Sequence, residues 1–315
     1  MIESDQNNLN NSQLLDDEID LKEIFDVIWK GKILILLVTS FVAICSIVYS
    51  LMLPNYYTSE SILVARDADS DGALSQYSGM ASLVGINLPA TNGTSIFKVM
   101  EIIKSREFVK HLITFENVLP SIIAAKSYDS SSQELYFDPE IYDVKTKTWT
   151  GKLPINQGIA PSYIEAHKEY GDMLSIIQDK ITSHLHIKIQ HFSPVFAKEF
   201  LALIIQEINK LEREREIDSS NQAQSYLRTE LAQTSLVEMK ESISKLIETE
   251  LKKGMMASIH DDYSLISLEP PFIPEKKSGP IRSLIVILST LIGGILSLTI
   301  VLVRHYASDK GIIDK

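Results

Sequence analysis

The sequence predicts an α+β membrane protein, in which two transmembrane helices flank an α/β base domain that carries a long protruding amphipathic helix. Three observations support this fold class. Two apolar runs without charged residues lie near the two ends of the chain. Short segments of β-forming residues between them predict strands. A long stretch without glycine or proline predicts an extended helix.

The chain has 315 residues and a formal net charge of −11. That length is sufficient for a sizeable core. The acidic balance argues against nucleic acid as a partner, because phosphate binding needs concentrated Lys and Arg.

The two apolar runs define the predicted organisation. Each has about 20 residues, which is the length that spans a hydrocarbon layer of about 30 Å as a helix. The leader before the first run is too long and too acidic for a cleaved signal peptide, so we expect an uncleaved anchor. The predicted segments are a tail with a short amphipathic helix (1–32), transmembrane helices at 33–53 and 281–303, a domain between them (54–280), and a second tail (304–315).

Basic residues near the ends of the two runs predict the orientation. They lie on the terminal side of each run, at Lys22, Lys30, Lys32, Arg304, Lys310 and Lys315, although Lys276, Lys277 and Arg282 weaken the asymmetry at the second run. We therefore expect both termini in the cytoplasm and residues 54–280 translocated. The single cysteine, Cys45, lies in the first run, so the translocated domain has no disulfide.

The elements follow in order along the chain. Residues 20–29 have helical apolar spacing and predict an amphipathic helix at the membrane surface. Residues 56–65 predict a strand. Residues 96–115 predict a helix with a break near Ser105.

The second half of the base is less regular. Residues 116–162 contain four prolines and give no clear pattern. Residues 163–177 predict a helix, and residues 186–190 and 263–268 predict strands. The base is therefore expected over about 54–195 and 255–280.

Residues 195–253 contain neither glycine nor proline and predict one long helix, which Gly254 ends. Unbroken, it would reach about 85 Å. The charged residues 212–216 are expected to project into water or to meet a partner. An apolar stripe on the protruding part is expected to be buried by neighbouring subunits: Leu227, Leu231, Met239, Ile243 and Leu246.

The segment before the second run contains Pro270, Pro271, Pro274 and Pro280, which exclude regular structure and predict a stiff lead into the membrane. Small residues within the second run predict a helix-packing face toward a neighbouring subunit or another membrane protein. They are Ser289, Gly293, Gly294 and Ser297.

The sequence contains little support for a calcium site, a zinc site or a catalytic site. Asp67, Asp69 and Asp71 fit the first half of a calcium loop, but Ser78 stands where a bidentate carboxylate is needed. The three histidines at 184, 186 and 191 cannot share one face of a strand, and no Cys completes a zinc site. No catalytic motif is present, so we expect a protein that is not an enzyme and needs no cofactor.

Several short motifs follow one another along the chain: PNYYTSESILV (54–64), MASLVG (80–85), IKSREF (103–108), Ser193-Pro194 with Ala197 and Asn209, and the proline-rich lead into a glycine-containing second span. Together they resemble the polysaccharide co-polymerases, the Wzz-like chain-length determinants of bacterial surface polysaccharides. Each motif is weak alone, and their order with this topology is more specific.

The resemblance implies a bacterial inner-membrane protein with a periplasmic base and a long helix. It implies a ring of identical subunits that works with a membrane-embedded polymerase and sets how many repeat units are added to a lipid-linked glycan. The sequence has no G-x-x-x-x-G-K-[ST] motif and about a dozen residues after Val303. It therefore resembles the kinase-free members, which control lipopolysaccharide O-antigen or enterobacterial common antigen.

Two other classes of function remain open. An export subunit or an adaptor of a separate tyrosine kinase would share the topology, and its deletion would abolish the exported polymer. A periplasmic sensor would need a cytoplasmic output domain, which the short tail does not supply.

Overall fold

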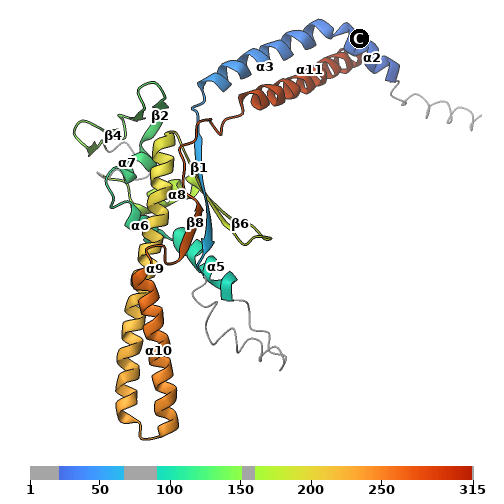
Figure 1. Ribbon diagram of the computed structural model, residues 1–315. Helices are drawn as coiled ribbons and strands as arrows, with labels where there is room; N and C mark the ends of the chain where they lie inside the picture. The colour runs from blue at the N-terminus through green and yellow to red at the C-terminus, as the bar shows by residue number, and fades with distance from the viewer. Residues whose placement is uncertain (1–20, 67–90, 151–159, 314–315) are drawn as a thin grey trace, which may run out of the picture. The chain divides into compact units, whose positions relative to one another are not determined.

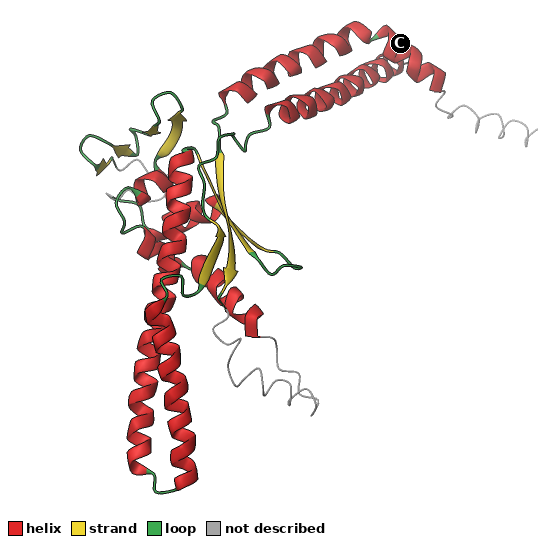
Figure 2. Cartoon of the chain, viewed as in Figure 1, coloured by secondary structure: helices red, strands yellow, loops and turns green. Residues whose placement is uncertain are grey.

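The computed structural model describes residues 21–66, 91–150 and 160–313. They belong to two compact units (Figure 1). The terminal unit comprises Met1–Leu53 and Pro280–Lys315, and the central unit comprises Pro54–Gly279. The described part of the terminal unit is helical, whereas the central unit mixes helices and strands (Figure 2). The predicted α+β class with a candidate membrane helix near each end is confirmed.

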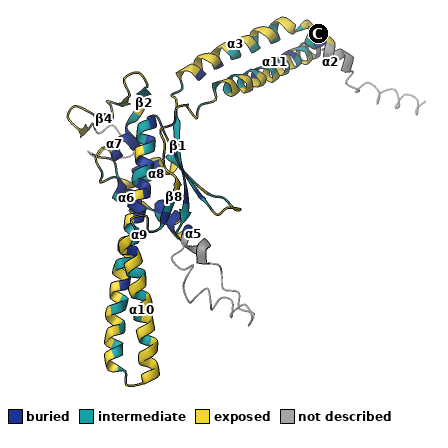
Figure 3. Cartoon of the chain, viewed as in Figure 1, coloured by how far each residue is buried: buried dark blue, intermediate teal, exposed yellow. Residues whose placement is uncertain are grey.

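The terminal unit contains α2 (Leu21–Lys30), α3 (Lys32–Met52) and α11 (Arg282–Ile313). α3 and the segment Arg282–Tyr306 of α11 are long and apolar enough to cross a membrane, with mean hydropathies of 2.5 and 2.6. They lie side by side, and their remaining apolar side chains are largely exposed (Figure 3). This exposure suits helices whose solvent is lipid.

The central unit is built on a four-stranded antiparallel sheet with the strand order β6-β7-β1-β8. The strands predicted over 56–65, 186–190 and 263–268 are confirmed as β1, β7 and β8 of this sheet. The bounds are Tyr57–Ala65 for β1, Leu174–Gln178 for β6, Leu185–His191 for β7 and Leu265–Glu269 for β8.

Alternate side chains of the two inner strands point into the core. Leu63 on β1 and Ile187 and Ile189 on β7 are fully buried, as the period-2 geometry of strands requires. Helix α9 packs across these strands. The face that the helices cover therefore forms the centre of the hydrophobic core.

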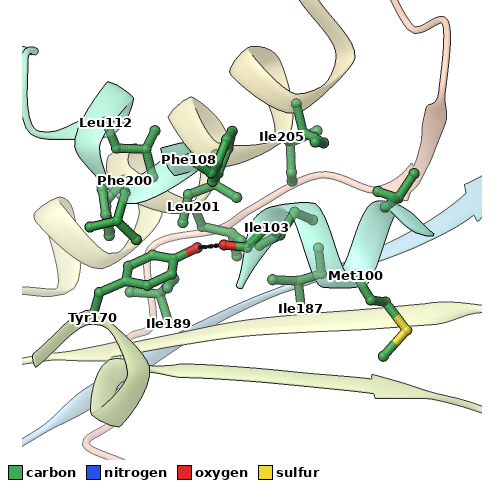
Figure 4. Close-up of a cluster of buried hydrophobic side chains, with 14 of the residues drawn as sticks. Met100, Ile103, Phe108, Leu112, Tyr170, Ile187, Ile189, Phe200, Leu201 and Ile205 are labelled. Atoms are coloured by element: carbon green, nitrogen blue, oxygen red, sulfur yellow. Dashed lines mark hydrogen bonds between the residues drawn. The ribbon is translucent and has the colours of Figure 1, made fainter. Parts of the chain in front are cut away.

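Shorter helices complete this core, namely α5 (Thr91–Ile103), α6 (Arg106–Leu112), α7 (Val118–Ile123) and α8 (Tyr163–Met173). Figure 4 shows Tyr170 of α8 among these side chains, with its hydroxyl donating to the carbonyl of Ile103 at 3.1 Å. This bond satisfies a polar group that would otherwise be buried without a partner.

Local caps explain two of the helix boundaries. The Ser105 hydroxyl accepts a hydrogen bond from the Phe108 N–H and begins α6, which confirms the predicted break. The helix predicted over 163–177 is wrong in its last part, because α8 ends at Met173. Residues Leu174–Gln178 instead form β6, whose backbone pairs with β7.

Residues 116–150, which have no clear pattern in the sequence, fold as a short helix and two small hairpins. Asp129 fixes the first turn, because its carboxylate accepts the Ser131 N–H at 2.8 Å. The elements are α7 (Val118–Ile123), β2 (Ala125–Asp129) with β3 (Glu134–Phe137), and β4 (Tyr142–Asp143) with β5 (Thr148–Trp149).

The single long helix predicted over 195–253 is wrong. The segment forms two helices, α9 (Pro194–Gln233) and α10 (Val237–Ile259), which fold back on each other (Figure 1). Thr234 and Leu236 have extended backbone conformations and reverse the chain. Pairing lets α10 cover apolar surface of α9 that a single rod would leave in water.

The proline-rich segment has no regular structure in the described residues after β8, as its composition predicts. Where the backbone pairing of β8 ends, side-chain hydroxyl groups of β1 attach this segment to the sheet. Ser61 donates to the carbonyl of Glu269 and Ser59 to that of Phe272, both at 2.7 Å. The last backbone pairing joins Tyr56 to Gly279.

Candidate functional site

The two candidate membrane helices meet through small residues. Gly293 of α11 lies against Val42 of α3 so closely that an added Cβ would come within 2.9 Å of the valine side chain. Ser297, one turn later, is fully buried, and its hydroxyl lies 3.5 Å from that of Thr39. Small residues allow this close approach, which supplies the dispersion contacts that join helices in lipid.

The predicted packing residues of the second span therefore divide into two groups. Gly293 and Ser297 contact α3 of the same chain, so the expectation that they face a neighbour or another protein is wrong for these two residues. Ser289 is half-buried. An added Cβ at Gly294 would meet no atom within 4 Å, and Gly294 lines a shallow groove of about 500 Å³ with Trp29.

The sequence reasoning missed the α3 side of this interface. Ser46 and Ser50 are buried, and with Thr39 and Val42 they follow one another at steps of three and four. The small polar side chains of Thr39, Ser46 and Ser50 in an otherwise apolar helix were the signal that could have revealed the face.

The α9–α10 pair has a comparable contact. Ser220 of α9 is fully buried, and its hydroxyl donates to the backbone carbonyl of Glu250 on α10. An added Cβ at Gly254 would come within 2.7 Å of the Ser220 oxygen. Gly254 therefore lies inside α10 as a point of close packing and does not end the helix, contrary to the prediction.

The predicted apolar stripe is only partly covered by this pairing. Leu227, Leu231 and Ile243 are half-buried, whereas Met239 and Leu246 of α10 are 51% and 53% exposed. Farther along α10, three exposed apolar residues line a groove of about 290 Å³ beside Gly254: Leu251, Met255 and Ile259. Folding back thus leaves apolar side chains of α10 exposed.

The four prolines differ in burial along the irregular segment. Pro274 is buried, Pro271 and Pro280 are half-buried, and Pro270 is exposed. The segment they stiffen continues from β8 along β1 and ends where α11 begins.

The motif around Ser193 fixes helix α9 to the sheet. The Ser193 hydroxyl accepts the Phe196 N–H, and Pro194 occupies the first turn, where its missing N–H costs nothing. Asn209 makes three hydrogen bonds to the backbone of β8 and the residue before it, donating to Leu265 and accepting from Ser264 and Leu265. These residues carry a structural role.

The charged stretch 212–216 does not simply project into water. Glu212 is buried, and its carboxylate pairs with Lys98 of α5 at 2.7 Å and with Arg215 at 2.9 Å. One turn earlier, the buried Glu207 lies 2.7 Å from the His111 ring. These pairs attach α9 to the shorter helices of the central unit.

The sheet face away from the helices carries an ionic group. Glu60 of β1 contacts His186 at 2.9 Å and Lys188 at 3.1 Å, both on β7. Burial acts to raise the pKa of Glu60, but the hydrogen bonds from His186 and Lys188 outweigh it and hold that pKa below its ordinary value.

The side chain of His191 points toward the core, and backbone groups form hydrogen bonds with both of its ring nitrogens. Its Nδ1 accepts the Ser193 N–H at 3.1 Å, and its Nε2 lies 3.0 Å from the Ser121 carbonyl. Burial lowers the pKa of His191 to about 4. Among the described residues there is no group of three possible metal ligands, and Asp67, Asp69 and Asp71 lie outside those residues.

Comparison with known proteins finds a family model that matches part of the chain. The family model described as "Wzz: Chain length determinant protein" matches residues 17–115. A comparison with curated protein sequences found no match.

Two solved structures show a remote likeness. One is described as a full-length bacterial polysaccharide co-polymerase, with 15% identity and a TM-score of 0.40, covering 93% of this chain and 99% of that one. The other is a fragment of WzzB, a polysaccharide co-polymerase from Salmonella Typhimurium, with 13% identity and a TM-score of 0.30, covering 71% and 100%. Both TM-scores are below 0.5, so neither likeness bears on function. Residues 17–115 of the chain therefore resemble the Wzz family of chain length determinant proteins.

Proposed function

We propose that this protein regulates the chain length of a bacterial surface polysaccharide, as an oligomeric inner-membrane scaffold that acts with the polymerase on a lipid-linked glycan. The match of residues 17–115 to the chain length determinant family carries this proposal. Lipopolysaccharide O-antigen is the polymer that we propose, in keeping with the motifs of the sequence. The role is not enzymatic.

The membrane arrangement in this proposal follows from the sequence. α3 and α11 cross the inner membrane, and the basic residues on their terminal sides favour a cytoplasmic location for both termini. The central unit then lies in the periplasm, where its helices and sheet can contact the growing glycan and the polymerase.

Electrophoresis of surface polysaccharide from a deletion strain tests the function. Length control predicts that polymer persists with an altered length distribution, and that restoring this chain restores the distribution. Loss of all exported polymer would instead identify an export subunit or a kinase adaptor. An unchanged ladder would refute the proposal.

Oligomer formation is tested at the apolar residues that α10 leaves exposed. Met239→Lys combined with Leu246→Lys places two charges on this surface, which should weaken subunit association about tenfold or more if a neighbour covers it. Thr229→Lys on the exposed part of α9 is the matched control. Light scattering of the full chain in detergent measures the mass, and an unchanged assembly in the double variant would exclude this interface.

A further inference from the structure

A small cavity opens at the end of the sheet where β1 begins and β7 ends. Its volume is about 260 Å³, below the range of roughly 300–1,000 Å³ that is typical of sites for larger small molecules. It has room for one ring-sized group. Tyr56, which lines it, comes four residues after Met52, the last residue of α3.

One wall of the cavity is aromatic. Tyr56 and Phe192 are stacked with ring centroids 4.9 Å apart, and both are half-buried. An aromatic wall of this kind offers an apolar surface with a polar tip at the tyrosine hydroxyl. The apolar C–H face of a sugar ring matches such a surface.

Polar groups from two other elements surround the same cavity. Glu169 and Asp172 come from the second half of α8, and Gln190 comes from the end of β7. All three are exposed, and within the described residues none of their side chains makes a hydrogen bond or an ion pair. Two carboxylates accept hydrogen bonds from hydroxyl groups, and an amide both donates and accepts.

The charge of the cavity restricts its ligand further. Among the described residues that line it, none is Lys or Arg. His191 lines the cavity, but both of its ring nitrogens are occupied by the backbone, and its lowered pKa keeps it neutral at physiological pH. An acidic ligand would meet two carboxylates without a compensating cation, which disfavours it strongly.

We propose that this cavity binds one neutral or amino sugar ring and rejects acidic sugars. The proposal rests on the proposed function in taking its ligand from the glycan whose length is controlled. Tyr56 and Phe192 cover the apolar face of the ring. Glu169, Asp172 and Gln190 bind its hydroxyl or amino groups.

Saturation-transfer NMR on the full chain in lipid nanodiscs tests the site with three probes that share one ring. Methyl glucoside and methyl glucosaminide should give a signal, and methyl glucuronide should give a signal weaker by about fivefold or more. Tyr56→Ala should abolish the signals of the first two probes. Tyr136→Ala, an exposed tyrosine of β3 that does not line the cavity, is the matched control.

A charge variant keeps the test decisive if Tyr56→Ala fails to fold. Glu169→Gln with Asp172→Asn changes only exposed side chains of α8 and should raise methyl glucuronide binding to the level of methyl glucoside. Glu214→Gln, at an exposed position of α9, should leave the discrimination unchanged. Equal binding of all three probes by the unmodified chain, or no binding of any, would overturn the proposal.

The two proposals can fail separately. If the unmodified chain binds none of the probes while its deletion alters the polysaccharide ladder, the sugar site is refuted and the proposed function stands. If deletion leaves the ladder unchanged, the proposed function fails, and the NMR result alone decides whether the cavity binds a sugar.

Discussion

The candidate membrane pair α3–α11 and the central pair α9–α10 are joined by similar contacts in different surroundings. In the first pair Gly293 lies against Val42, and in the second Gly254 lies against Ser220. An added methyl group would come within 2.9 Å and 2.7 Å of the facing side chains. A glycine thus lets two helices approach closely in both places. The dispersion contacts that this approach gains act at short range in either solvent.

The two pairs differ in what their outer surfaces need. Lipid solvates exposed apolar side chains of α11 such as Leu291 and Ile295, so these side chains do not by themselves require a protein partner. Water does not solvate Met239 and Leu246 of α10, which therefore favour burial against a partner. In the oligomer that we propose, we therefore expect subunit contact at the central pair.

The largest effect is expected where Asn209 attaches α9 to the sheet. Asn209→Leu removes three hydrogen bonds to the backbone around Leu265 and should destabilise the central unit by about 4 kcal/mol. Urea unfolding measures this through Trp149, which is the only tryptophan left when Trp29 is replaced by Phe.

Asn221→Leu, at an exposed position of α9, serves as the control and should change the free energy of unfolding by less than about 0.5 kcal/mol. A loss of less than about 1 kcal/mol for Asn209→Leu would show that α9 is held mainly by apolar packing.

Acid should destabilise the central unit through His191, because this side chain accepts the backbone N–H of the residue that caps α9. Its pKa is about 4 in the folded state and 6.5 when unfolded. The neutral ring therefore contributes stability fully above pH 6.5. That contribution is lost as the pH falls toward 4 and amounts to about 3 kcal/mol.

Urea unfolding at pH 7.5, 5.5 and 4, again through Trp149, measures this loss. His191→Gln should remove most of the dependence between pH 6.5 and 4. If His191→Gln keeps the full pH dependence of the free energy of unfolding, that dependence arises from other groups.

The membrane pair is tested by Gly293→Leu. Overpacking against Val42 should weaken the α3–α11 contact by about 2 kcal/mol and disturb length control. The unfolding of the central unit, followed by Trp149, should stay the same. Thr299→Leu, which adds bulk on the exposed side of α11, should leave the polysaccharide ladder unchanged. An unaltered ladder in Gly293→Leu would count against a role for this contact.

The smallest effect is expected at Gly254. Alanine there gains helix propensity of about 1 kcal/mol, but its methyl group meets the Ser220 hydroxyl, so the net loss should be about 1 kcal/mol. Ser220→Ala in the same chain should recover stability. A double-mutant cycle by urea unfolding measures the coupling, and additivity of the two changes would show that the residues do not touch.

The sequence predicts well those boundaries that local chemistry determines. The break at Ser105 and the start of α9 at Ser193 are marked by hydroxyl caps within four residues of the bonds they make. The strand β1 follows from its own composition.

Helix and strand boundaries that depend on contacts with distant parts of the chain cannot be predicted from local sequence. Residues 234–236 contain neither glycine nor proline, and the chain reverses there because α10 finds its place against Ser220. Likewise Leu174–Gln178 is a strand only because β7 lies beside it. The spacing of Gly293 and Ser297 correctly indicated a packing face, but spacing alone cannot say whether the partner belongs to the same chain.

The edge of the sheet at β8 has a consequence for how copies of this protein can assemble. Asn209 occupies backbone groups at the start of β8, and Pro270 and Pro271 follow its end without N–H groups to offer. A foreign strand therefore finds few donors or acceptors there, which guards against edge-to-edge aggregation. Crowded copies are thereby hindered from joining their sheets through the β8 edge.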